Sequence, residues 1–176
     1  MRGFGPLFFS LPQFNTMTDL PYYLVRLEKG FDLSTLLDAP NWNPHSMEGY
    51  RRHQKVLVSF IEFCLEQSWT VYLPIFDENE GWDYGVDVFV NGQAIDLKSF
   101  GLREDAKTKT FDSPAYNGKG AHPKSLTSWL IFAPLGSSAD TWEAAPFKRQ
   151  QKSKYGYAPY FWKKDVVSFS EFASAL

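Results

Sequence analysis

At 176 residues, with 44% hydrophobic and 22% charged side chains, the chain is long enough to bury one core, and its composition excludes an intrinsically disordered protein. Its apolar runs are far shorter than the roughly 20 residues that span a bilayer, so we expect no membrane association. The formal net charge of −2 is uneven: residues 51–100 carry 4 basic and 8 acidic side chains, and residues 101–176 carry 11 and 7. An acidic middle before a basic end is typical of a carboxylate metal site beside a phosphate-binding surface, although ordinary globular proteins also show it.

The single cysteine and the N-terminal residues indicate the cellular compartment of the protein. Cys64 excludes an internal disulfide framework and a zinc site built from cysteines. Pro6 and Pro12 interrupt the apolar residues 7–9, and no small-residue cleavage site follows, so we expect no signal peptide. These features together predict a cytoplasmic protein.

The first third of the chain predicts a strand and two helices. Residues 20–29 are aromatic and β-branched, which is typical of a strand, and Asp32 can cap a brief helix that ends at Leu37. Ser46 is a suitable N-cap for a long helix at residues 47–68. The 3.6-residue period gives that helix one apolar stripe, made of Tyr50, Leu57, Phe60, Ile61 and Cys64.

The rest of the chain predicts a strand-rich domain. Strands are expected at residues 69–75, 85–90, 93–99, 128–133 and 157–169, with a polar loop at 101–124 and a short helix at the C-terminus. No repeat or long linker divides the chain, so residues 1–176 form a single mixed α/β domain. Its parts are an N-terminal extension to residue 45, a helix and three-stranded meander at 46–100, and a basic half at 101–176 that completes the sheet.

Asn91-Gly92 predicts a tight hairpin between two of these strands. Asn-Gly is the strongest local hairpin pattern, because a type I′ turn needs a positive φ at both central residues. A two-residue loop makes Val90 face Gln93, and the same register puts Asp87 directly across from Asp96. One face of the hairpin is then apolar, with Val86, Val88, Val90, Ile95 and Leu97. The other face carries Asp87, Phe89, Ala94, Asp96 and Lys98.

Two opposed carboxylates predict a cation between them. Facing side chains in a sheet start about 4.5–5.5 Å apart, so the charges of Asp87 and Asp96 repel one another. A divalent cation removes that repulsion, and Mg²⁺ prefers one or two carboxylates together with water and phosphate oxygens. Lys98 projects from the same face and can orient an attacking water. The same three residues are also compatible with a solvated strand face that carries an ordinary ion pair.

Asp87, eight intervening residues and then Asp96-Leu97-Lys98 resemble the signature of the PD-(D/E)xK nuclease superfamily, which includes restriction endonucleases and Holliday-junction resolvases. The order of elements is also similar: an amphipathic helix, a strand, the aspartate strand and the DxK strand. The resemblance covers residues 47–100 and implies a restriction-endonuclease-like core, with a mixed β-sheet flanked by helices. It implies one or two Mg²⁺ ions, replaceable by Mn²⁺, on Asp87, Asp96 and the carbonyl of Leu97. Lys98 would position the water that attacks a phosphodiester.

The chain departs from the family pattern on the helix. Many members carry a glutamate on its sheet-facing side, whereas Glu48, Glu62 and Glu66 here fall on the solvent side of the helix. Near the core side lie His53 and Gln54, and either of them replaces the glutamate or the second metal is absent. Because oxygen donors suit Mg²⁺ better than imidazole does, we expect Gln54 to serve as the catalytic helix residue. Glu62 takes that role if the helical face is assigned wrongly.

A basic run near the C-terminus predicts a nucleic-acid contact. Its members are Lys148, Arg149, Lys152 and Lys154, with aromatic residues close behind, and a solvated basic loop explains them equally well. We therefore expect an endonuclease that acts on DNA, located in the host cytoplasm if phage-encoded. One alternative is a structure-selective nuclease of the resolvase type, which works as a homodimer. The other is a protein that binds nucleic acid on a nuclease fold without cutting it.

Overall fold

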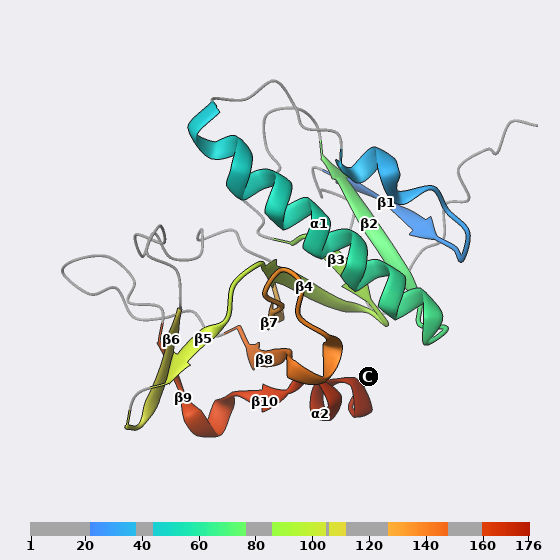
Figure 1. Cartoon of the computed structure of the whole chain (residues 1–176). Helices are drawn as coiled ribbons and strands as arrows, with labels where there is room; N and C mark the ends of the chain where they lie inside the picture. The colour runs from blue at the N-terminus through green and yellow to red at the C-terminus, as the bar shows by residue number, and fades with distance from the viewer. Residues whose placement is uncertain (1–21, 38–43, 77–85, 105, 112–126, 148–159) are drawn as a thin grey trace, which may run out of the picture.

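The computed structural model describes residues 22–37, 44–76, 86–104, 106–111, 127–147 and 160–176. In this part the protein is a mixed α/β fold with a seven-stranded mixed sheet, a small three-stranded sheet and two α-helices (Figure 1). The large sheet contains β1 (Tyr22–Leu27), β2 (Val71–Phe76), β3 (Val88–Val90), β4 (Gln93–Lys98), β7 (Trp129–Phe132), β8 (Glu143–Pro146) and β10 (Val167–Ser168). The small sheet contains β5 (Leu102–Glu104), β6 (Thr108–Phe111) and β9 (Tyr160–Trp162). The helices are α1 (Pro44–Glu66) and α2 (Phe169–Ser174).

The large sheet has the order β1-β2-β3-β4-β7-β8-β10. β4 and β7 run parallel, with Ile95 beside Trp129 and Lys98 beside Phe132, and the other neighbouring pairs are antiparallel. The predicted succession of one helix and three strands is present as α1, β2, β3 and β4, with Asp87 one residue before the start of β3. Residues after 101 contribute β7, β8 and β10 to the large sheet.

Helix α1 packs its predicted apolar stripe on one face of this sheet (Figure 1). Leu57, Phe60, Ile61 and Cys64 are buried, and Tyr50 is half-buried. The helix begins at Pro44 rather than after Ser46, so Ser46 is not its cap. Proline suits a first helical turn, because the amide it lacks would have no helical partner there.

Both described helices lie on the same face of the large sheet. Phe169 and Phe172 of α2 belong to the same core cluster as the α1 stripe, and Phe60 of α1 packs edge-on against Phe169 with ring centroids 5.7 Å apart. Helices were expected to flank the sheet. Within the described residues, however, the opposite face carries no helix and is covered at β7 and β8 by the small sheet.

The small sheet lies where the sequence predicts a loop. β5 and β6 fall within residues 101–124, and β9 comes from the predicted strand at 157–169, which is split between the two sheets. Phe161 of β9 packs on Leu130, Phe132 and Ala145 of the large sheet. An ion pair between Lys109 on β6 and Glu143 on β8 also joins the two sheets. None of the described helices is long and apolar enough to cross a membrane.

Candidate functional site

The hairpin of β3 and β4 has the predicted turn and register. Asn91 and Gly92 both adopt positive φ angles, 46° and 83°, as a type I′ turn requires. Val90 pairs with Gln93, and Val88 pairs with Ile95. The turn is anchored to the residue just before β2, because Asn91 accepts a hydrogen bond from the amide of Thr70 and donates its own amide to the Thr70 carbonyl, both at 2.8 Å.

The register changes at Asp87, so this residue does not pair directly with Asp96 as predicted. The amide of Asp87 donates to the carbonyl of Ile95 at 2.8 Å, although Ile95 is already the partner of Val88. Two residues of one strand therefore oppose one residue of the other, which is the arrangement of a β-bulge. The carboxylate Oδ2 of Asp87 accepts a hydrogen bond from the amide of Leu97 at 2.6 Å. Asp87 is thus hydrogen-bonded to the two residues of β4 that flank Asp96, namely Ile95 and Leu97.

Because of the bulge, the two faces of the hairpin carry other residues than predicted. Val86 packs with Tyr72, Phe89 and Ala94 on the side away from the main core cluster, whereas Val88 packs in that cluster. Phe89 and Ala94 are buried, so the face expected to gather charge is apolar near the turn. Its charged groups lie toward the other end of the hairpin.

Asp96 and Lys98 form an ion pair on β4. Lys98 Nζ lies 2.7 Å from Asp96 Oδ1, and the two side chains are 22% and 18% exposed. Burial raises the pKa of Asp96 to about 6, since the opposing charge of Lys98 lowers it by less than burial and the nearby charge of Asp87 raise it. In the metal-free protein this carboxyl group therefore holds its proton more firmly than an ordinary aspartate.

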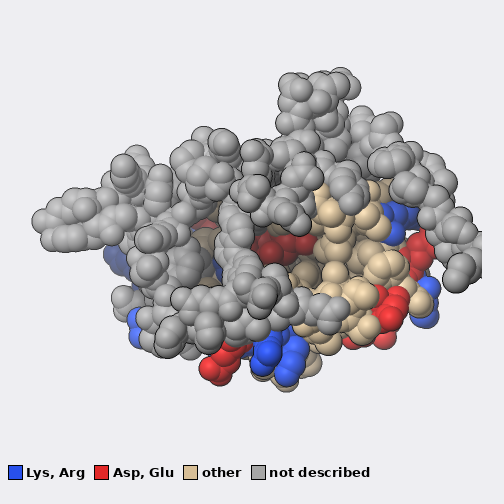
Figure 2. Space-filling model, turned by 90° about the horizontal axis from the view of Figure 1, so that it is seen from above, with Lys and Arg blue, Asp and Glu red and all other residues tan. Residues whose placement is uncertain are grey.

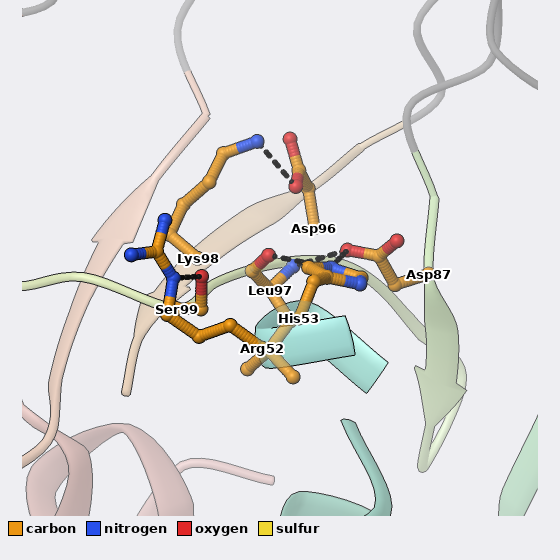
Figure 3. A network of polar contacts seen from close by, with 7 residues as sticks. All are labelled: Arg52, His53, Asp87, Asp96, Leu97, Lys98 and Ser99. Atoms are coloured by element: carbon orange, nitrogen blue, oxygen red, sulfur yellow. Dashed lines mark hydrogen bonds and ion pairs between the residues drawn. The ribbon is translucent and has the colours of Figure 1, made fainter. Parts of the chain in front are cut away.

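His53 of α1 contacts two of the predicted metal-binding groups. Its Nε2 lies 3.3 Å from Asp87 Oδ2 and 3.1 Å from the carbonyl oxygen of Leu97 (Figure 3). Burial by itself lowers the pKa of His53, but the charge of Asp87 and the contact with it raise the pKa above the ordinary value. Burial likewise opposes ionisation of Asp87, yet the charge of His53 holds the pKa of that carboxyl below its usual range. The two groups behave as an ion pair.

Arg52 makes a second contact between α1 and β4. Its Nε donates to Ser99 Oγ at 3.3 Å, one residue beyond the end of β4. Figure 3 shows the groups in the order of the strand: Arg52 with Ser99 on one side, then Lys98 with Asp96, then Asp87 on the other side. Neighbouring residues of α1 therefore contact β4 at Leu97 and the chain just beyond it at Ser99.

The other helix residues divide as the sequence predicts, but Gln54 does not reach the carboxylates. Glu48, Glu62 and Glu66 are exposed. Gln54 points inward, and its buried Oε1 has no hydrogen-bond partner among the described residues. The structure brings His53, and not Gln54, to Asp87 and Leu97. A role for Gln54 in catalysis stays a prediction.

The site has few side-chain donors for a cation. Among the described residues, no three His, Cys, Asp or Glu side chains come together as a metal-binding group. A cation held here therefore needs the carbonyl of Leu97 and water in addition to side chains. In the view from above in Figure 2, acidic side chains are visible near the middle of the molecule. The predicted basic run of Lys148, Arg149, Lys152 and Lys154 lies outside the described residues.

Three features of the site could not be taken from the sequence motif. The contacts of His53 and Arg52 depend on how α1 crosses β4: helical periodicity turns His53 toward the sheet, but it places Arg52 on the solvent side of the helix. The bulge at Asp87 has no distinctive sequence, because the alternation of Val86, Val88 and Val90 continues through it.

The chain matches no protein-family model, no curated protein and no solved structure.

Proposed function

We propose that the protein is a Mg²⁺-dependent phosphodiester hydrolase with a restriction-endonuclease-like core, and that it acts as an endonuclease on DNA. One observation carries the proposal: Asp87, just before β3, accepts a hydrogen bond from the Leu97 amide of β4, so its carboxylate lies beside Asp96 and Lys98, and His53 of the preceding helix contacts it.

The donor set fits Mg²⁺ or Mn²⁺. Asp87 Oδ1 and Asp96 Oδ2 have no hydrogen-bond partner among the described residues, so each carboxylate keeps one oxygen available. His53 Nε2 lies within hydrogen-bonding reach of Asp87 Oδ2 and of Leu97 O, at 3.3 and 3.1 Å, so it holds these two groups in place. Asp87, Asp96 and the carbonyl of Leu97 are therefore the groups that would hold the ion, together with water.

The chain's own residues would prepare the phosphodiester for attack by water. A bound divalent cation supplies Lewis acidity and a water of lowered pKa. Lys98, fixed by Asp96 at 2.7 Å, presents a positive charge that can orient the water or the phosphate oxygens. The carbonyl of Leu97 and the carboxylate of Asp87 are held in place by His53 and by the Leu97 amide. The expected products are a 5′-phosphate and a 3′-hydroxyl.

A second function is favoured by the same contacts. Each carboxylate already has a basic partner, Asp87 in His53 and Asp96 in Lys98, so their charges are balanced without a cation. A nucleic-acid-binding protein on this fold could keep them as structural ion pairs. Such a protein would bind DNA equally well with a chelator present.

Cleavage assays separate these functions. Purified protein is incubated with plasmid DNA, branched DNA and RNA, with Mg²⁺ or with chelator, beside the variants Asp87→Ala and Asp96→Asn. We expect Mg²⁺-dependent nicking of the plasmid by the wild type and none by either variant, with both variants folded by circular dichroism. Exclusive cutting of branched DNA would identify a resolvase-type nuclease. Cleavage by either variant, or none by the wild type, would rule out the proposed site.

A further inference from the structure

The geometry points to a phosphate-binding subsite at Arg52, held in place by Ser99 and separate from the carboxylate site. The inference rests on the proposed function, because its ligand is a backbone phosphate of the nucleic acid. Arg52 is an exposed residue of α1, yet its Nε is tied to Ser99 Oγ at 3.3 Å across 47 residues of sequence. Side chains of exposed arginines are usually free to rotate, and this contact restricts the guanidinium to one position beside the site.

The contact leaves the binding edge of the guanidinium open. Ser99 engages Nε, and the two terminal nitrogens have no partner among the described residues. Those nitrogens form the planar fork that matches two oxygens of a phosphate. Arg51, the preceding residue, is also exposed but has no such contact with β4 among the described residues.

The position of Ser99 suggests which phosphate Arg52 takes. Ser99 lies three residues after Asp96, just beyond the end of β4, so their backbones are at most about 10 Å apart. Lys98, between them, is already paired with Asp96. Arg52 therefore suits a phosphate next to the one at the carboxylates, so that it binds and aligns the strand and takes no part in the bond that breaks.

The test measures binding and cleavage of a short fluorescent DNA duplex. Binding is titrated in chelator over a range of salt concentrations, for the wild type and for Arg52→Ala, Arg52→Lys, Ser99→Ala and Arg51→Ala. We expect Arg52→Ala to weaken binding roughly tenfold or more, because a charge-assisted fork is lost. It should also reduce the slope of log K against log[salt] by about 0.9. Arg52→Lys and Ser99→Ala should keep the slope and still lose affinity, since they keep the charge but lose its geometry.

Cleavage with Mg²⁺ gives the second measurement. Arg52→Ala and Ser99→Ala should raise KM more than they lower kcat, and Arg51→Ala should have a clearly smaller effect on KM. Equal effects of Arg51→Ala and Arg52→Ala would overturn the subsite, because diffuse charge would then explain both. Normal binding and cleavage by Arg52→Ala would overturn it and leave the nuclease function standing. Arg52-dependent binding without any cleavage by the wild type would support the subsite and reject the nuclease.

Discussion

At the scale of single residues, the two aspartates differ in electrostatic state although they are neighbours. Asp87 is paired with His53, which lowers the pKa of the carboxyl, whereas Asp96 is buried beside that charge and has a pKa of about 6. Below about pH 6, an ion that binds both must displace the proton of Asp96. In the metal-free protein, ionisation of Asp96 is therefore less favourable than that of an ordinary aspartate.

We predict that the ionisation of Asp96 lowers the stability of the metal-free protein as the pH rises. A carboxyl whose folded pKa is above its unfolded value stabilises the fold at low pH, and the contribution is lost as the pH rises through the folded pKa. In chelator, the wild type should lose stability relative to Asp96→Asn between about pH 4 and about pH 7. The upper limit is about 3 kcal/mol, because the two pKa values differ by roughly two.

Urea unfolding of both proteins across this range makes the measurement. Glu62→Gln, a change at an exposed carboxylate of α1, serves as the control and should follow the wild type. Parallel profiles of the wild type and Asp96→Asn would contradict the prediction.

His53 offers a prediction with a definite sign. His53 holds Asp87 and the Leu97 carbonyl in place, so His53→Ala should lower Mn²⁺ affinity by at least about tenfold, because residues that position ligands contribute that much. If His53 instead competes with the ion for Asp87, His53→Ala should raise the affinity. Calorimetric titration with Mn²⁺ distinguishes the two, and we expect the loss.

Gln54 and Glu62 test the face of α1 by a different measurement. Gln54→Ala should reduce the cleavage rate more than it reduces stability, and Glu62→Ala should change neither, since Glu62 is exposed. Loss of activity in Glu62→Ala with full activity in Gln54→Ala would contradict this assignment. Rates are measured under single turnover, so that product release does not hide the effect.

At the scale of elements, the sequence predicts what local rules determine. The turn at Asn91-Gly92 and the stripe of α1 follow from φ preference and periodicity, and both are present. The bulge at Asp87 depends on a side chain that bonds the neighbouring strand, so alternation alone misplaces Val86. The hairpin of β5 and β6 is rich in charged residues, which are poor strand formers. It is stabilised by contacts of Leu102 and by β9, distant in sequence, neither of which a local pattern reveals.

The Asn91 turn supports a stability prediction. Asn91→Ala should destabilise the protein by about 1–3 kcal/mol, because alanine tolerates a positive φ poorly and cannot accept the Thr70 amide. Asn91→Gly should cost less, since glycine removes only the hydrogen bond. Urea denaturation ranks the two variants. Equal stability of Asn91→Ala and the wild type would mean that the turn does not depend on this residue.

At the scale of the whole molecule, the chain separates its charges along the sequence. Residues 51–100 carry 4 basic and 8 acidic side chains and include both aspartates of the site. Residues 101–176 carry 11 basic and 7 acidic side chains and also supply three strands of the large sheet. An acidic site repels DNA unless basic groups elsewhere offset the repulsion. The C-terminal half is the part of the sequence able to do so.

Variants of the basic run test whether the C-terminal half offsets the repulsion between the acidic site and DNA. If Lys148, Arg149, Lys152 and Lys154 contact phosphates, replacing all four by alanine should flatten the slope of log K against log[salt] by up to about 3.6, at about 0.9 per contact on duplex DNA. Affinity should fall most at low salt, while metal binding at Asp87 and Asp96 should stay as in the wild type. The matched control replaces Lys107 and Lys164, both exposed, and should change the slope less. A slope that the fourfold variant leaves unchanged would return the run to an ordinary solvated loop, and the compensating charge would have to come from Arg52 and Lys98 at the site itself.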